Sequence, residues 1–168
     1  YFTGDARGFE RDVARTHDRL NADGVFGLFP QALEAHPGDG VTSFNDLTSH
    51  FDAGPDGPTC AAWTPGYPVF EDCPADEARR ACRWGTSCAD DVGMVREIVS
   101  QLTSTYAIDP DRIWLTGFSQ GGNAAQGWAC ALQDLVSAIA PLHGAAANGH
   151  TCGPTAGVSL MDVWGATD

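Results

Sequence analysis

The hydrophobic and polar positions in the second half of the chain alternate between helical and strand-like patterns. Residues 90–106 begin with an acidic pair suited to capping and continue with apolar residues at helical spacing. The bulky run at 113–116 predicts a buried strand, and a second helix is predicted over 122–135. Apolar runs at 136–141 and 158–164 predict two more strands. Strands separated by helices indicate an α/β fold with a mainly parallel sheet flanked by helices.

The first half of the chain is less regular. An amphipathic helix is predicted over 9–20, and the apolar run at 25–30 predicts a buried strand closed by proline. Residues 31–89 show no periodicity and are rich in glycine, proline and aspartate, which predicts a long loop insertion. Its aromatic residues form either a small core under the loop or a groove for an aromatic or polymeric substrate. These are Trp63, Tyr67, Phe70 and Trp84.

Size and charge limit what the protein can do. The 168 residues are 43% hydrophobic, and we interpret residues 1–168 as a single domain. The net charge of -13, with only 9 Lys and Arg residues, argues against nucleic acid or an anionic membrane surface as a partner. No apolar run reaches the roughly 18 residues of a transmembrane helix. The oligomeric state stays open.

The sequence Gly117-Phe118-Ser119-Gln120-Gly121 joins the second-half strand to the helix that follows it. A Gly-x-Ser-x-Gly motif in this context is typical of a nucleophile elbow, a sharp turn that exposes the serine hydroxyl. Glycines on both sides allow the strand and the helix to approach closely. The Gln120 amide begins the helix, where unpaired N–H groups and the helix dipole favour an oxyanion. A chance motif in a glycine-rich loop is the alternative.

A serine nucleophile needs a histidine base and a carboxylate that orients it, in the chain order Ser, acid, His. We expect Asp168 to be the acid because it follows a predicted strand, whereas Asp162 lies inside that strand. The base is then expected beyond Asp168. The five histidines present are interpreted as surface or loop residues: His17, His36, His50, His143 and His150. No His, Cys and Asp cluster has metal-binding spacing.

Six cysteines without Cys-x-x-Cys spacing predict disulfides in an oxidising, extracellular or periplasmic setting, with free buried thiols as the alternative. They are Cys60, Cys73, Cys82, Cys88, Cys130 and Cys152. Four of the six fall within the long loop, so we expect the loop to be stapled. The chain begins at Tyr1 without methionine and stops on Asp168, directly after a predicted strand. We therefore expect both ends to be truncated, which leaves open whether these residues are active alone.

The elbow and the residues before it resemble the α/β-hydrolase superfamily, and more narrowly the extracellular polyhydroxybutyrate depolymerase and feruloyl esterase group. The segments at 57–60 and 82–93 resemble the cysteine-rich part of that group. The final strand resembles one that ends in His-Gly-Thr-x-Asp, with Trp164 in place of the histidine. Residues 1–4 resemble the stretch that follows the His-Gly of the oxyanion loop, so the Tyr1 amide would be a second oxyanion donor.

This resemblance implies a secreted serine esterase that needs no cofactor and acts on feruloyl or acetyl polysaccharide esters or on polyhydroxyalkanoate. With it we prefer the pairs Cys130–Cys152, Cys82–Cys88 and Cys60–Cys73, although other connectivities stay open. Ser119 is the expected nucleophile and Gln120 the expected oxyanion donor. Two alternatives are a serine peptidase of the same fold and a non-catalytic domain that binds a polymer or carbohydrate.

Overall fold

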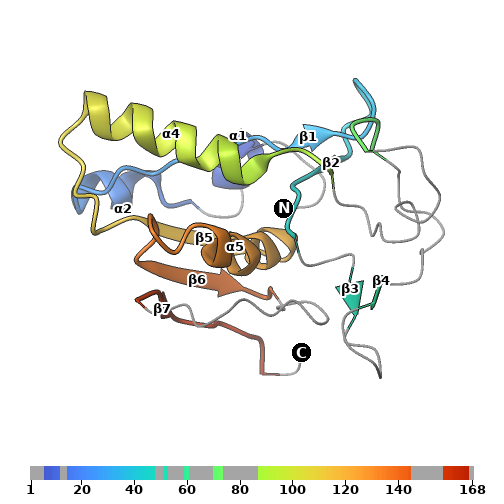
Figure 1. Ribbon diagram of the computed structural model, residues 1–168. Coiled ribbons are helices and arrows are strands. Elements are labelled where there is room, and N and C mark those ends of the chain that lie inside the picture. Colours follow the sequence, from blue (N-terminus) through green and yellow to red (C-terminus); the bar gives the residue numbers. More distant parts are fainter. Residues whose placement is uncertain are drawn as a thin grey trace.

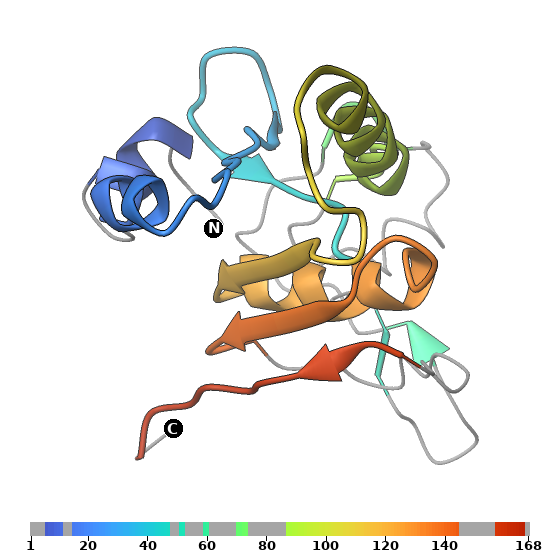
Figure 2. The same ribbon diagram turned by 90° about the vertical axis from the view of Figure 1, so that its left-hand side faces the viewer.

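A computed structural model describes residues 6–11, 15–47, 51–52, 59–60, 70–73, 87–144 and 157–166. The elements of the second half form a parallel sheet with the order β5-β6-β7. These strands are β5 (Trp114–Phe118), β6 (Ala138–Leu142) and β7 (Ser159–Leu160). The helices of this half are α4 (Asp91–Thr105) and α5 (Gln120–Ala131). Figures 1 and 2 show α4 beside the β5 edge of the sheet and β7 at the opposite edge.

The second-half elements form where the pattern predicts them, with shifted ends. Asp90 caps α4, as its side chain accepts a 2.9 Å hydrogen bond from the Gly93 N–H. The α5 helix begins two residues earlier than predicted and ends at Ala131. The strand predicted over 158–164 is reduced to β7 and an isolated bridge between Val163 and Leu142. The predicted α/β content and the parallel sheet are confirmed, over a sheet of three strands.

One hydrophobic core joins α4, α5 and the sheet. Val95 of α4 contributes to it, together with Trp128 and Ala124 of α5 and Ile139 of β6. The partly buried Leu115 of β5 packs against this cluster. At the surface, Arg96 of α4 makes two 2.8 Å hydrogen bonds to the Asp134 carboxylate, whose pKa it lowers. The shared core packs α4 and α5 against the sheet, and the Arg96–Asp134 pair links α4 to the segment after α5.

Two predictions for the first half are wrong. Instead of one helix over 9–20, the chain forms α1 (Ala6–Phe9) and α2 (His17–Ala22). Arg15 lies between them with φ of 48°, a left-handed conformation that a continuous helix cannot include. Residues 25–30 form no strand, and Phe26 is 54% exposed and stacks on Tyr106 instead. An apolar run becomes a buried strand only where another strand pairs with it. None of the described strands pairs with residues 25–30.

The described parts of the long loop contain two small antiparallel pairs. Strand β1 (Leu33–Glu34) pairs with β2 (Thr42–Ser43), and β3 (Phe51–Asp52) pairs with β4 (Thr59–Cys60). A second, smaller core under this region contains Phe70, which is fully buried among the described residues. For Phe70 this agrees with the prediction of a small core under the loop; Trp63, Tyr67 and Trp84 lie outside the described residues.

A disulfide staples the long loop, but it joins a different pair of cysteines from those predicted. Cys73 is bonded to Cys88, with their Cα atoms 5.1 Å apart. This pairing overturns the predicted pairs Cys82–Cys88 and Cys60–Cys73. The two partners are brought together by the preceding residue, since the Asp72 carboxylate accepts a 2.7 Å hydrogen bond from the Cys88 N–H. Cys130 is also disulfide-bonded. Its predicted partner, Cys152, lies outside the described residues, so the pair Cys130–Cys152 stays a prediction. Cys82 also lies outside the described residues.

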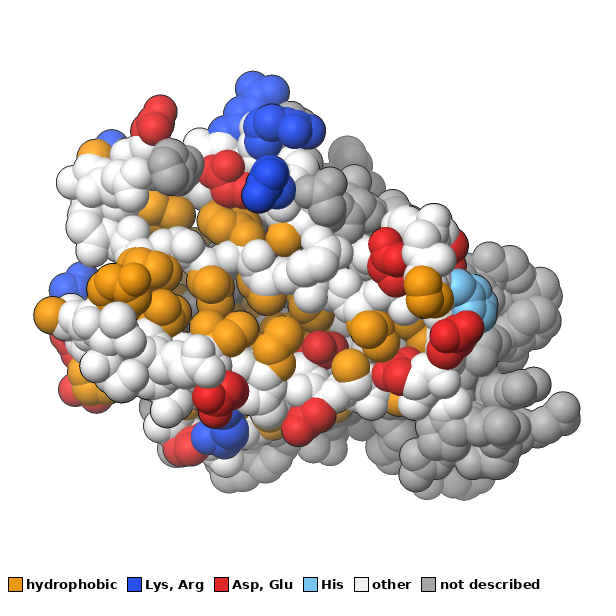
Figure 3. All heavy atoms as spheres, turned by 90° about the horizontal axis from the view of Figure 1, so that it is seen from above, with side chains coloured by type: hydrophobic (Ala, Val, Ile, Leu, Met, Phe, Trp, Pro, Cys, Tyr) orange, Lys and Arg blue, Asp and Glu red, His pale blue; other side chains and the backbone are white. Residues whose placement is uncertain are grey.

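Large apolar side chains remain exposed at the surface, including one on strand β5. Trp114 of β5 is half exposed, although strands of parallel sheets are normally covered on both faces. Figure 3 shows hydrophobic side chains gathered in the middle of the face seen from above. The described residues leave this surface uncovered. No helix among them is both long and apolar enough to span a bilayer.

Candidate active site

Ser119 lies at the sharp turn between β5 and α5, and its side chain is exposed. Its backbone has φ of 55° and ψ of -121°, a region that residues with a Cβ rarely occupy. Such a conformation costs on the order of 1–3 kcal/mol and persists only where the surroundings enforce it. The strand, the turn and the helix expected around this serine are therefore all present, and the serine itself is exposed.

Backbone hydrogen bonds hold the turn in place on both sides. The Ser119 N–H donates to the Leu142 carbonyl of β6 at 2.9 Å. The Ser119 carbonyl accepts from the N–H groups of Gly122 and Asn123 at 2.8 and 3.1 Å. Because Phe118 pairs with Leu142 in register, Ser119 stands at the carboxyl end of β5 beside the end of β6. Ligands of open parallel sheets bind at this end of the strands.

Three glycines make the close approach of these segments possible. A Cβ on Gly117 would collide with the backbone carbonyl of Gly121, so strand and helix could not meet at their present separation. A Cβ on Gly122 would lie 2.8 Å from the Cα of Gly144, which follows β6. The glycines that frame Ser119 are thus needed for space, not for a positive φ. Gly144 belongs to this arrangement but carried no recognisable signal in the sequence.

Gln120 is the first residue of α5, and its backbone N–H belongs to the first helical turn. Such N–H groups have no acceptor within the helix and can bind an anion. The Gln120 side chain is only 8% exposed and turns inward. Its Nε2 donates to the Ser43 hydroxyl, in a segment 77 positions away in the sequence. The backbone N–H of Gln120, directly after Ser119, is placed where it could donate to the oxyanion of a carbonyl attacked by Ser119.

The segment that contacts Gln120 was not recognised from the sequence. Residues 42–46 include three buried polar positions within a region read as irregular loop: Thr42, Ser43 and Asp46. Asn45 fixes the segment by three hydrogen bonds. Its backbone N–H donates to the Asp91 carboxylate at 2.6 Å, and its side-chain amide donates to the Ala89 carbonyl at 3.0 Å. Its backbone carbonyl accepts a hydrogen bond from Trp128 Nε1 at 2.8 Å. A periodicity search cannot find such a segment, because its burial follows from long-range contacts.

Asp91 is a buried carboxylate in this network. Burial raises its pKa above the ordinary value, the hydrogen bond from the Asn45 N–H opposes this, and the charges of Asp72 and Asp90 raise it further. The folded state therefore binds this proton more tightly than the unfolded state does. The contribution of Asp91 to the free energy of unfolding then falls as the pH rises from 3.8 through the raised pKa.

The variant Asp91→Asn keeps an oxygen acceptor for the Asn45 N–H but cannot titrate. We expect its free energy of unfolding, measured relative to that of the wild type, to increase as the pH rises from about 4 to about 7. Urea denaturation of both proteins at a series of pH values measures this difference. A difference that stays constant with pH would contradict the raised pKa.

Other expected site residues fall outside what the structure describes or away from Ser119. Tyr1 and Asp168 both lie outside the described residues, so their roles stay predictions. Asp162 is exposed beyond β7. His143 follows β6, next to the end of β5, and its exposed ring packs against Phe118 with centroids 5.5 Å apart. Among the described residues, no group of three or more His, Cys, Asp or Glu side chains is arranged to hold a metal ion.

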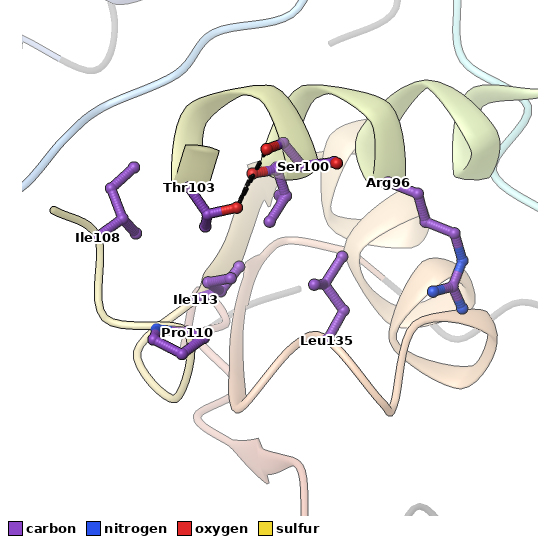
Figure 4. A pocket seen from close by; sticks show the side chains of 8 residues that line it. Arg96, Ser100, Thr103, Ile108, Pro110, Ile113 and Leu135 are labelled. Atoms are coloured by element: carbon purple, nitrogen blue, oxygen red, sulfur yellow. Dashed lines mark hydrogen bonds between the residues drawn. The ribbon is translucent and has the colours of Figure 1, made fainter. Parts of the chain in front are cut away.

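A pocket of about 420 Å³ lies at the other end of β5. Figure 4 shows Ile113, Pro110 and Leu135 lining it below α4, with Thr103 hydrogen-bonded to the Ser100 carbonyl at 3.2 Å. Ile113 immediately precedes β5 and Ser119 immediately follows it, which separates them by roughly 20 Å along an extended strand. The pocket is thus distinct from the surface around Ser119, and its lining is mainly apolar.

Comparison with known proteins finds a partial relative. The chain is 33% identical over 84 residues to feruloyl esterase B of Piromyces equi. The match covers 48% of this chain and 16% of that protein, so the chain corresponds to a small part of its relative. No family model matches the chain, and no solved structure matches it. The similarity connects half of this chain to an esterase.

Proposed function

We propose that this protein is a serine hydrolase of the α/β-hydrolase fold that cleaves carboxylic esters. The observation that carries the proposal is the backbone of Ser119, strained at φ of 55° between a parallel strand and a helix, with its side chain exposed. This geometry is what a nucleophile elbow requires. The partial similarity to feruloyl esterase B supports an ester as the substrate.

In the proposed mechanism the Ser119 hydroxyl attacks the ester carbonyl while a histidine beyond Asp168 accepts its proton. Asp168 orients that histidine. The Gln120 N–H and an N–H from the Tyr1 loop stabilise the oxyanion. The tetrahedral intermediate collapses, the alcohol leaves with the proton from the histidine, and an acyl-serine remains. Water, deprotonated by the same histidine, then releases the acid and restores the serine.

The substrate class is the finer part of the proposal. The name of the partial relative favours feruloyl esters of polysaccharides, while acetyl esters and polyhydroxyalkanoate are the other candidates. A secreted protein is consistent with the Cys73–Cys88 disulfide, because such bonds persist in oxidising compartments.

The test compares ester and amide turnover by the full-length protein. We expect hydrolysis of methyl ferulate and p-nitrophenyl acetate, with peptide p-nitroanilides cleaved at least about a hundredfold more slowly. Liquid chromatography of released ferulate and absorbance of p-nitrophenolate measure the rates. Faster amide cleavage would make the protein a peptidase. Retention on insoluble xylan or polyhydroxybutyrate with no turnover of any ester would make it a binding domain.

A further inference from the structure

The geometry points to the side chain of Gln120 as a positioning residue for the oxyanion donor. Through Ser43 and Phe44 it holds the Gln120 backbone N–H in the direction that an oxyanion on the substrate needs. This inference rests on the proposed esterase function and assigns a role to groups that do not touch the substrate. It makes the segment 43–45, far from the elbow in sequence, part of what sets the rate.

The orientation of one peptide plane decides where the Gln120 N–H points. The Ser119 carbonyl and the Gln120 N–H belong to the same peptide group and point in opposite directions. Hydrogen bonds from Gly122 and Asn123 to the Ser119 carbonyl, at 2.8 and 3.1 Å, fix one side of this plane. The plane can still tilt about these bonds unless the Cα of Gln120 is also held. Besides the first turn of α5, the side chain of Gln120 holds this Cα through its hydrogen bond to Ser43.

The side chain of Gln120 is anchored on Ser43 and Phe44. Gln120 Nε2 donates to the Ser43 hydroxyl and lies 3.5 Å from the Phe44 carbonyl. The Ser43 hydroxyl donates in turn to the same Phe44 carbonyl at 3.2 Å, and Ser43 is fully buried. Phe44 is held edge-on against Trp128 of α5, with ring centroids 5.3 Å apart. The carboxamide therefore ends on a segment that is itself fixed to the core.

The carboxamide of Gln120 is only partly satisfied by hydrogen bonds. Gln120 Oε1 is buried and has no hydrogen-bond partner among the described residues. An unsatisfied buried polar atom destabilises the fold, whereas an apolar side chain of the same length would avoid the loss. The contact to Ser43 thus contributes more to the direction of the Gln120 N–H than to stability. Replacing Gln120 with an apolar residue of the same length should therefore lower the rate without lowering the stability.

Two variants separate these effects in the full-length protein. Gln120→Met keeps the length of the side chain and removes its hydrogen bonds, and Ser43→Ala removes the acceptor while leaving Gln120 in place. We expect each to lower kcat for methyl ferulate by about 10- to 100-fold, as small misplacements of catalytic groups do, with KM within about twofold. The double variant should be no slower than the slower single one, because both changes break one contact.

The affinity for a trifluoromethyl ketone provides the readout that a purely structural role would not move. Its adduct with the serine carries an oxyanion, so its Ki should rise by the same factor as kcat/KM falls. Titration of active sites with a fluorophosphonate corrects for any unfolded protein. The matched controls are Gln101→Met and Ser104→Ala, exposed residues of α4 whose side chains bond only within that helix.

Unchanged kcat and Ki in both variants would overturn the inference, as would losses in the two that multiply in the double variant. A loss confined to the titrated number of active sites would also overturn it, because it would reflect folding alone. In these cases the esterase proposal still stands if the wild type hydrolyses the ester. If the wild type turns over no ester at all, the proposed function fails first, and this inference fails with it.

Discussion

Ser119→Ala should abolish ester hydrolysis, lowering kcat by on the order of 10⁶-fold. The variant loses the attacking oxygen while the backbone of the turn is unchanged, since alanine is as strained as serine at φ of 55°. Its stability should therefore equal that of the wild type. Ser119→Gly should be equally inactive yet more stable by about 1 kcal/mol, because glycine tolerates this conformation. Initial rates with methyl ferulate and urea denaturation measure both effects.

The control for this pair is Ser159→Ala, which removes an exposed serine at the start of β7. It should leave the rate and the stability as they are. Residual turnover by Ser119→Ala within about tenfold of the wild type would rule out the serine as nucleophile. A loss of stability in Ser119→Gly would argue against the strained turn.

Gly117→Ala should have the second largest effect. The added Cβ meets the backbone carbonyl of Gly121, which cannot rotate away as a side chain would. Strand β5 and helix α5 must then move apart, at a cost of about 1–3 kcal/mol or more in the free energy of unfolding. Since this shift displaces the hydroxyl and the helix N-terminus, kcat per active site should fall by about 100-fold.

Gly38→Ala separates loss of stability from displacement of the turn. Gly38 has φ of 86°, and a Cβ there would meet no atom within 4 Å. Its substitution should destabilise the protein by roughly 1 kcal/mol through backbone strain and leave kcat unchanged. If Gly117→Ala matched the wild type in both stability and kcat, the close packing of β5 on α5 would not be needed for activity.

The sequence was informative where local chemistry decides the structure. The turn around Ser119 could be predicted because bulky strand residues, two glycines and a helix follow one another within a short stretch. The cap of α4 by Asp90 is equally local, since a side chain three residues away from Gly93 satisfies its N–H. In each case the partners are close in sequence, and the residue types themselves restrict the backbone.

The sequence was misleading where distant contacts decide. The apolar run at 25–30 reads as a strand, yet no described strand pairs with it and Phe26 stacks on Tyr106. The pairing of Cys73 with Cys88 depends on how the loop returns to α4, which cysteine spacing does not encode. Burial of Ser43 depends on Gln120, a partner 77 positions away. None of these long-range contacts produces a periodic pattern of hydrophobic residues in the sequence.

The most direct test of a nucleophilic serine is a covalent label located by mass spectrometry. The full-length protein is treated with a fluorophosphonate, digested, and searched for the modified peptide. The predicted result is one phosphonate per chain, carried by Ser119, whose incorporation proceeds in parallel with the loss of ester turnover. Label on a different serine, or full inactivation with Ser119 unmodified, would contradict the account.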